Sequence, residues 1–141
     1  MHFLRQSWLT IALLSSFSIN AKSTSALHST AIIDSNNKHL TVINVWQVNK
    51  DVSKKKLVEA LKYGVEKNMK NFTGFISATV HESMDDDTVI VYAQWKSGKD
   101  LQMAASAIQS GKAPEMAKAF SMGKPNYHPY KVHKTIRSNK N

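Results

Sequence analysis

Hydrophobic and polar residues follow two different periods along this chain, and the change of period marks the predicted elements. Two runs rich in β-branched and aromatic residues, Phe75 to His81 and Thr88 to Trp95, predict strands. Between them, residues 83–87 (SMDDD) supply the Ser and Asp that favour a short turn. We therefore predict a β-hairpin, and the other elements are arranged around it.

Two elements are predicted before the hairpin. Thr41 to Val48 (TVINVWQV) is apolar on both faces, so we predict a strand covered on both sides. Ser53 is a favourable N-cap for a helix that extends to about Asn71. Its apolar residues recur every four positions from Leu57 to Met69, which indicates one buried stripe. Gly64 on this helix favours a close approach of another backbone or of a ligand.

Three elements are predicted after the hairpin. A short helix starts at Lys99 or Asp100 and ends near Ser110, and a second starts at Pro114 and ends near Met122. Tyr127 to Ile136 predicts a last strand, in which Pro129 requires an edge or a bulge. The order β-α-β-β-α-α-β predicts an α+β fold, a ferredoxin-like sandwich with helices on one face of the sheet.

The hairpin register decides which side chains share a surface, because a slip of one residue reverses a strand. An odd-length loop centred on Asp86 would pair His81 with Val91 and Ser77 with Trp95. His81 and Trp95 would then lie together on the surface that faces the helices. An even-length loop would separate them.

The face of the sheet away from the helices is also expected to be apolar. The residues that we assign to it are Ile76, Ala78, Val80, Ile90 and Tyr92. A single small layer of helices cannot cover both faces, so we predict a homodimer that packs sheet on sheet.

The first 21 residues have the pattern of a signal peptide. Arg5 is followed by the short apolar run Trp8 to Ile19 and then by small residues, with cleavage after Ala21 or Ala26. We therefore expect an exported protein, periplasmic or secreted, without stable membrane insertion after cleavage. A buried N-terminal helix and an uncleaved interfacial anchor are the alternatives. Residues 22–39 are predicted as a linker or loose arm, 40–137 as one domain and 138–141 as a tail.

Composition narrows the partners of this 141-residue chain. It has 19 Lys and Arg against 10 Asp and Glu, but the basic residues are scattered and form no stripe with aromatic residues, so we expect no nucleic-acid binding. It contains no cysteine, so no disulfide supports the fold. His128 and His133 would face opposite sides of a regular strand, which argues against a metal site.

His81 and Trp95 are the candidates for chemistry. An imidazole takes up a proton near neutral pH, and an indole offers a flat apolar face with one N–H donor. Asn44 is a polar residue in an apolar strand and must find a partner or line a cavity. The structural alternatives are a solvent-facing histidine, a core tryptophan and an asparagine bonded to backbone at an edge.

The segment from Gly74 to Ser97 (GFISATVHESMDDDTVIVYAQWKS) resembles the antibiotic biosynthesis monooxygenase family. The resemblance implies a homodimer of α+β domains and a monooxygenase that needs no flavin or metal. Such an enzyme oxidises an anthrone, phenol or quinol-like substrate with O2. His81 would accept the proton and Trp95 would donate a hydrogen bond to a substrate oxygen. The residues expected around the substrate are Asn44, Trp46, Tyr63, Met69, Phe72, Val91 and Leu101.

The chain departs from this resemblance at two positions. Anthrone-oxidising members carry Asn where this chain has Val91 and Tyr where it has Leu101. These replacements favour a second function, a non-catalytic dimeric module that binds a small aromatic or lipid-like ligand. Haem-degrading relatives carry a Trp at the position of Ala104, so haem oxygenation is not expected.

Overall fold

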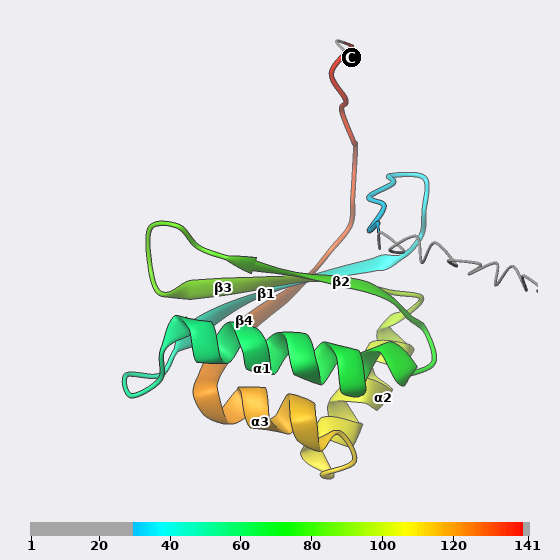
Figure 1. The fold of residues 1–141 in the computed structure, drawn as a ribbon. Helices are drawn as coiled ribbons and strands as arrows, with labels where there is room; N and C mark the ends of the chain where they lie inside the picture. The colour runs from blue at the N-terminus through cyan, green and yellow to red at the C-terminus, as the bar shows by residue number, and fades with distance from the viewer. Residues whose placement is uncertain (1–29, 140–141) are drawn as a thin grey trace, which may run out of the picture.

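The computed structural model describes residues 30–139. One antiparallel sheet in the strand order β2-β3-β1-β4 carries the three α-helices on the same side (Figure 1). The predicted signal peptide lies outside the described residues. The elements in chain order are β1 (Leu40–Val48), α1 (Lys54–Lys67), the short 3-10 helix η1 (Met69–Asn71), β2 (Phe75–Glu82), β3 (Thr88–Trp95), α2 (Gly98–Gln109), α3 (Pro114–Met122) and β4 (Gly123–Tyr130).

This order confirms the predicted β-α-β-β-α-α-β arrangement and the α+β, ferredoxin-like fold. The predicted helix starts are confirmed too: the Ser53 hydroxyl accepts a hydrogen bond from the Lys56 backbone N–H, and Pro114 is the first residue of α3. The first helix is shorter than predicted, because α1 ends at Lys67 and the chain continues as a 3-10 turn.

The core lies between the sheet and the helices α1 and α3. Leu57 and Leu61 of α1 are fully buried against the sheet. At Gly64 the two helices come very close, since a Cβ atom there would lie 2.9 Å from the Met116 Cα atom. The Asn68 side chain holds the same junction by accepting a hydrogen bond from the Met116 backbone N–H at 2.9 Å. The close approach predicted at Gly64 is therefore confirmed, and its partner is backbone.

Replacing Gly64 with alanine is expected to destabilise the domain. The added methyl group must push α3 away from α1, which costs about 1–3 kcal/mol of unfolding free energy and exceeds the gain of about 1 kcal/mol in helix propensity. Gly98 is the control, because a Cβ atom there meets nothing within 4 Å. Urea denaturation should show a loss for Gly64→Ala and none for Gly98→Ala; equal stability of the two variants would contradict this packing.

The predicted register of the hairpin is wrong. His81 pairs with Ile90 and Ser77 with Gln94, and a bulge between Phe75 and Ser77 brings Phe75 opposite Trp95. Six residues therefore separate the paired positions Glu82 and Val89, which is an even loop. His81 consequently lies on the opposite face of the sheet from Trp95.

The turn itself shows why the even loop is stable. The Ser83 hydroxyl accepts hydrogen bonds from the backbone N–H groups of Asp85 and Asp86, and the Asp86 carboxylate accepts from the backbone N–H and hydroxyl of Thr88. The hydrogen bond from the Thr88 hydroxyl lowers the pKa of Asp86 below its ordinary value. Lys54, at the start of α1, donates to the backbone oxygens of Ser83 and Asp86, both at 2.8 Å. A side chain remote in sequence thus helps to fix the loop.

The last strand also differs from its prediction. It spans Gly123–Tyr130 rather than Tyr127 to Ile136, and it follows α3 without a loop. Among the described strands it pairs with β1 alone, and Thr41 pairs with Tyr130. Residues after Tyr130 therefore run beyond the end of β1 and have no strand to pair with. The predicted edge position is confirmed, and it tolerates Pro125 and Pro129, which lack a backbone N–H.

No helix or strand of residues 30–139 packs on the face of the sheet opposite the helices, although Thr41 and Gln94 at one end of this face are buried (Figure 1). Ile90 and Tyr92 lie on it as predicted, together with His81. The assignment of Ala78 and Val80 to this face is wrong, because the register pairs them with Ala93 and Val91 on the helix side, where they pack against the core. No helix in the described part of the chain is long and apolar enough to cross a membrane.

Candidate active site

A cavity of about 810 Å³ lies between the sheet and the helices. The central strands β1 and β3 form its floor, α2 and α3 contribute most of the helical wall, and β4 closes one side. Its wall residues are Val42, Asn44, Trp46, Leu61, Val65, Met69, Phe75, Ala78, Val91, Ala93, Trp95, Gly98, Leu101, Gln102, Ala104, Ala105, Ile108, Gln109, Met116, Ala117, Phe120, Pro125 and Tyr127. This volume is in the range of pockets that enclose small organic molecules.

The floor of the cavity is set by strand alternation. Val42, Asn44 and Trp46 of β1 point to the helix side, and their partners in β3 are Ala93, Val91 and Val89. Trp95 ends this row and packs edge to face against Phe75, with the ring centroids 5.3 Å apart. The floor therefore combines aromatic rings with one amide.

The helical wall leaves room because the side chains of α2 that are buried are small. Only Ala104 and Ala107 are buried on α2, so this helix cannot fill the space above the sheet. Phe120 of α3 packs edge to face on Trp46, with the ring centroids 4.9 Å apart, and 43% of its surface is exposed. Tyr127 of β4 is 57% exposed. Phe120 and Tyr127 therefore stand where the cavity meets solvent.

The wall of this cavity contains no Asp, Glu, Lys, Arg or His, although the chain carries 29 charged residues in all, 19 basic and 10 acidic. Its polar side chains are the amides of Asn44, Gln102 and Gln109, the Tyr127 hydroxyl and the indole N–H groups of Trp46 and Trp95. A neutral and largely apolar guest suits such a wall, since a buried charge would find no partner.

Several of these polar groups have no hydrogen-bond partner among residues 30–139. Among the described residues, the buried Trp46 Nε1 atom has no hydrogen-bond acceptor. The side chains of Asn44 and Tyr127 also make no hydrogen bond within residues 30–139. Unpaired polar groups beside a cavity are the groups that fix the orientation of a ligand.

The structure brings together most of the residues predicted around the substrate. Asn44, Trp46, Met69, Val91 and Leu101 all line the cavity, and so does Trp95. Their roles toward a substrate stay predictions. No group of three or more His, Asp or Glu side chains that could hold a metal ion occurs in the described part of the chain.

The predicted location of His81 is wrong. Its partner Ile90 lies on the open face of the sheet, and the exposed His81 side chain is not part of the cavity wall. The even-length turn causes this difference, because it pairs His81 with Ile90 rather than with Val91. A catalytic role for His81 would need access to substrate from the open face, so it stays a prediction to be tested by substitution.

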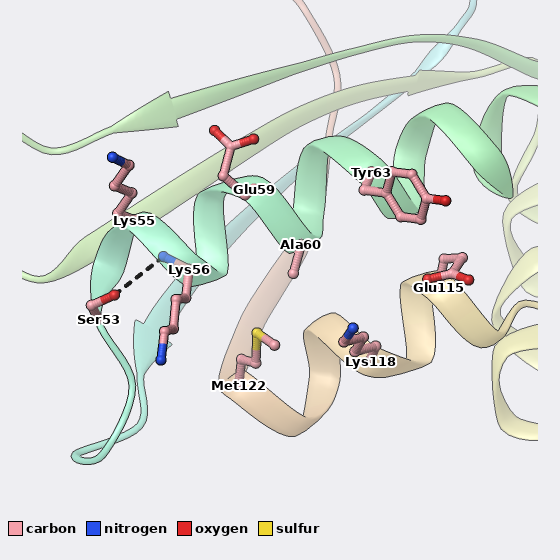
Figure 2. Close-up of a pocket in the computed structure, with 9 residues that line it drawn as sticks. All are labelled: Ser53, Lys55, Lys56, Glu59, Ala60, Tyr63, Glu115, Lys118 and Met122. Carbon is pink, nitrogen blue, oxygen red and sulfur yellow. Dashed lines mark hydrogen bonds between the residues drawn. The ribbon is translucent and has the colours of Figure 1, made fainter.

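Tyr63 and Phe72 also lie outside the cavity wall. Tyr63 is two positions past Leu61, about 200° further around α1, and therefore points away from the sheet. It lines a second, shallow groove of about 590 Å³ between α1 and α3, together with Lys118 and Glu115 (Figure 2). Phe72 packs half-buried against the core, because the chain becomes extended there after the 3-10 turn.

The sequence did not single out Phe120, Tyr127 or the two glutamines of α2. The apolar pattern of α3 could have indicated Phe120 as a core residue, but not its contact with Trp46. Tyr127 was placed at the start of the last strand without a face. Because β4 starts four residues earlier, its register with β1 assigns Tyr127 to the helix side, opposite Asn44.

Residues 39–121, more than half of the chain, match the antibiotic biosynthesis monooxygenase family. The chain belongs to this family. Its resemblance to the family in the hairpin is thereby confirmed, and the match runs from the start of β1 to the last turn of α3.

Individual members of the family show how far the similarity extends. Tetracenomycin-F1 monooxygenase from Streptomyces glaucescens is 36% identical over 62 residues, which are 44% of this chain and 54% of that protein. The chain thus matches about half the length of this relative.

Two solved structures have the same fold. The monooxygenase from ActVA-Orf6 of Streptomyces coelicolor, in complex with nanaomycin D, has a TM-score of 0.60 and 26% identity, and the match covers 76% of this chain and all of that one. An anthrone oxidase-like protein has a TM-score of 0.64 and 25% identity, covering 76% of this chain and 44% of that one.

Proposed function

We propose that this protein is a cofactor-independent monooxygenase that oxidises a neutral, flat aromatic substrate of the anthrone, phenol or quinol type with O2. The observation that carries the proposal is the cavity of about 810 Å³, whose aromatic floor and uncharged wall suit such a substrate. Family membership supports the reaction type, and the relatives support the substrate class: one was solved with nanaomycin D and another is anthrone oxidase-like.

The proposed reaction needs only the substrate and O2. An anthrone loses the proton of its ring CH2 group, and the resulting electron-rich anion reduces O2 as a carbon–oxygen bond forms. The peroxide then takes up a proton and loses water, which leaves a carbonyl group at that carbon. One oxygen atom enters the product and the other leaves as water, and the substrate carbon supplies all four electrons that reduce O2.

The cavity contributes to this reaction mainly by binding. The rings of Trp46 and Trp95 give a flat substrate apolar contact area, and the wall excludes water from the reacting anion. The Asn44 amide and the Trp95 N–H can donate hydrogen bonds to the oxygen on which negative charge develops, which stabilises the anion. No ionised base lines the cavity, so the proton leaves to solvent at the open end beside Phe120 and Tyr127.

The first test is oxygen uptake with 1,8-dihydroxyanthrone, measured on the protein as produced in its native host. Saturable uptake above the no-protein control is expected. His81→Ala should keep uptake within about twofold of wild type, because His81 lies on the other face of the sheet. A loss of about 10²-fold, as for removal of a general base, would instead place substrate or its proton within reach of His81.

A second candidate function is favoured by one observation. Val91 and Leu101 make the cavity apolar where anthrone-oxidising members are polar, which suits passive binding of an aromatic or lipid-like ligand. Uptake equal to the no-protein control, together with saturable binding of the anthrone, would identify the protein as this binding module.

We further propose a homodimer that packs through the open sheet face. Ile90 is 36% exposed near the centre of this face, beside Tyr92 and Val45. Ile90→Lys would place a charge without a partner in the interface and should raise the dimer dissociation constant by about 10²-fold or more. Met84→Lys is the control, since Met84 is 98% exposed in the hairpin turn. Light scattering should show a dimer for wild type and Met84→Lys; a monomeric wild type would contradict the proposal.

A further inference from the structure

Two polar side chains face each other on the β4 side of the cavity. Asn44 of β1 is directly opposite Tyr127 of β4, and both line the cavity. Directly opposed residues of an antiparallel pair have Cβ atoms about 4.5–5.5 Å apart. The neighbouring pair in the register is Trp46 and Pro125, and Trp46 is buried under the helices. Asn44 and Tyr127 therefore lie on the helix side of the sheet.

Nothing in the described chain satisfies these two groups. Neither the Asn44 amide nor the Tyr127 hydroxyl makes a hydrogen bond within residues 30–139. An apolar guest that covered them without offering a partner would leave buried polar groups unpaired, which is costly. A guest that carries an oxygen atom at this end offers these donors an acceptor.

The register also relates this pair to the apolar positions of the floor. Asn44 is flanked by the apolar Val91 on β3 and by Tyr127 on β4, so this polar pair lies on the β1–β4 side of the cavity floor. Tyr127 lines the cavity and is 57% exposed, so it stands where the cavity meets solvent.

We propose that Tyr127 and Asn44 together bind one oxygen substituent of the aromatic substrate and thereby set its orientation in the cavity. The aromatic class of the substrate in this inference rests on the proposed function. The binding role of the two residues does not require that the protein oxidises the substrate. Tyr127 acts as a hydrogen-bonding and positioning residue, with the hydroxyl and the amide N–H both donating to the same oxygen.

The test compares two ligands that differ by one oxygen, 1-naphthol and naphthalene, by titration of the intrinsic tryptophan fluorescence. Wild type should bind 1-naphthol more tightly than naphthalene. Tyr127→Phe should weaken 1-naphthol by about 3- to 10-fold, as for loss of one hydrogen bond, and leave naphthalene within about twofold. Tyr130→Phe should change neither, because Tyr130 is on the same strand but pairs with Thr41 on the open face.

A second variant tests the pairing itself. If both groups bind one oxygen, the losses in 1-naphthol affinity for Asn44→Ala and Tyr127→Phe should not add in the double variant. Equal affinity of wild type for the two ligands, equal weakening of both ligands by Tyr127→Phe, or full additivity would each overturn the proposal.

Oxygen uptake separates this inference from the proposed function. Selective weakening of 1-naphthol by Tyr127→Phe in a protein that takes up no oxygen would retain the polar pair and reject the oxygenase. Uptake with an unchanged KM for 1,8-dihydroxyanthrone in Tyr127→Phe would retain the oxygenase and overturn the role of Tyr127.

Discussion

Replacing Ala105 with tryptophan is expected to lower kcat/KM for oxygen uptake with 1,8-dihydroxyanthrone by about 10²-fold, the effect of displacing a substrate from its productive position. Ala105 lies on the face of α2 that lines the cavity, and its side chain is exposed, so the substitution does not disturb the buried core. An indole there occupies the space that the small residues of α2 leave above the sheet.

The matched control is the neighbouring residue of the same helix. Ser106 is exposed and is not part of the cavity wall. Ser106→Trp adds the same indole on another side of α2 and should leave uptake and KM unchanged. Circular dichroism and thermal unfolding check that both variants fold. Wild-type uptake in a folded Ala105→Trp variant would show that the substrate does not occupy this cavity.

Replacing Leu57 with alanine is expected to remove about 2–5 kcal/mol of unfolding free energy, a large part of the roughly 5–15 kcal/mol that stabilises a typical domain. Leu57 is fully buried between α1 and the sheet. It also packs against the start of β4, where a Cβ atom on Gly123 would lie 2.9 Å from its Cδ2 atom. Removal of its side chain therefore leaves a void at the junction of three elements.

Leu101→Ala makes the same chemical change beside a space that already exists. Leu101 is half-buried and lines the cavity, so its loss enlarges the cavity rather than creating a new one and should cost clearly less. Urea denaturation of both variants, compared at unchanged m-values, measures the difference. An equal loss for the two leucines would show that the cavity wall is as tightly packed as the core.

Much of the fold could be predicted from local signals. Ser53 and Pro114 mark helix starts through capping and through the fixed backbone of proline, and both hold in the structure. The i, i+4 stripe of α1 buries Leu57 and Leu61 as its period requires. Strand alternation predicts that Asn44 and Trp46 share one face of β1, and in the structure both line the cavity.

The face of the sheet on which a site residue lies was predicted correctly where the pattern of a single strand decides it. It was missed where the register between two strands decides it. His81 was assigned to the wrong face because one loop residue decides the face of a whole strand. The contacts that fix the loop include Lys54, a residue from another element, which no local pattern reveals. Tyr127 was predicted at the start of a strand because residues 123–126 (GKPN) have the composition of a turn, so the true start of β4 and the face of Tyr127 were missed.

The sequence by itself determined the type and order of the elements, the family and the apolar stripe that forms the core, because capping, propensity and periodicity act between residues near one another in the chain. Only the tertiary structure decided the hairpin register, the extent of β4 and the meeting of Asn44 with Tyr127. These depend on which strands lie side by side and where each one ends. The register and the length of a strand depend on pairings between segments that are distant in the sequence. For β4, the pairing with β1 extends as far as Thr41 and Tyr130, and β4 ends there.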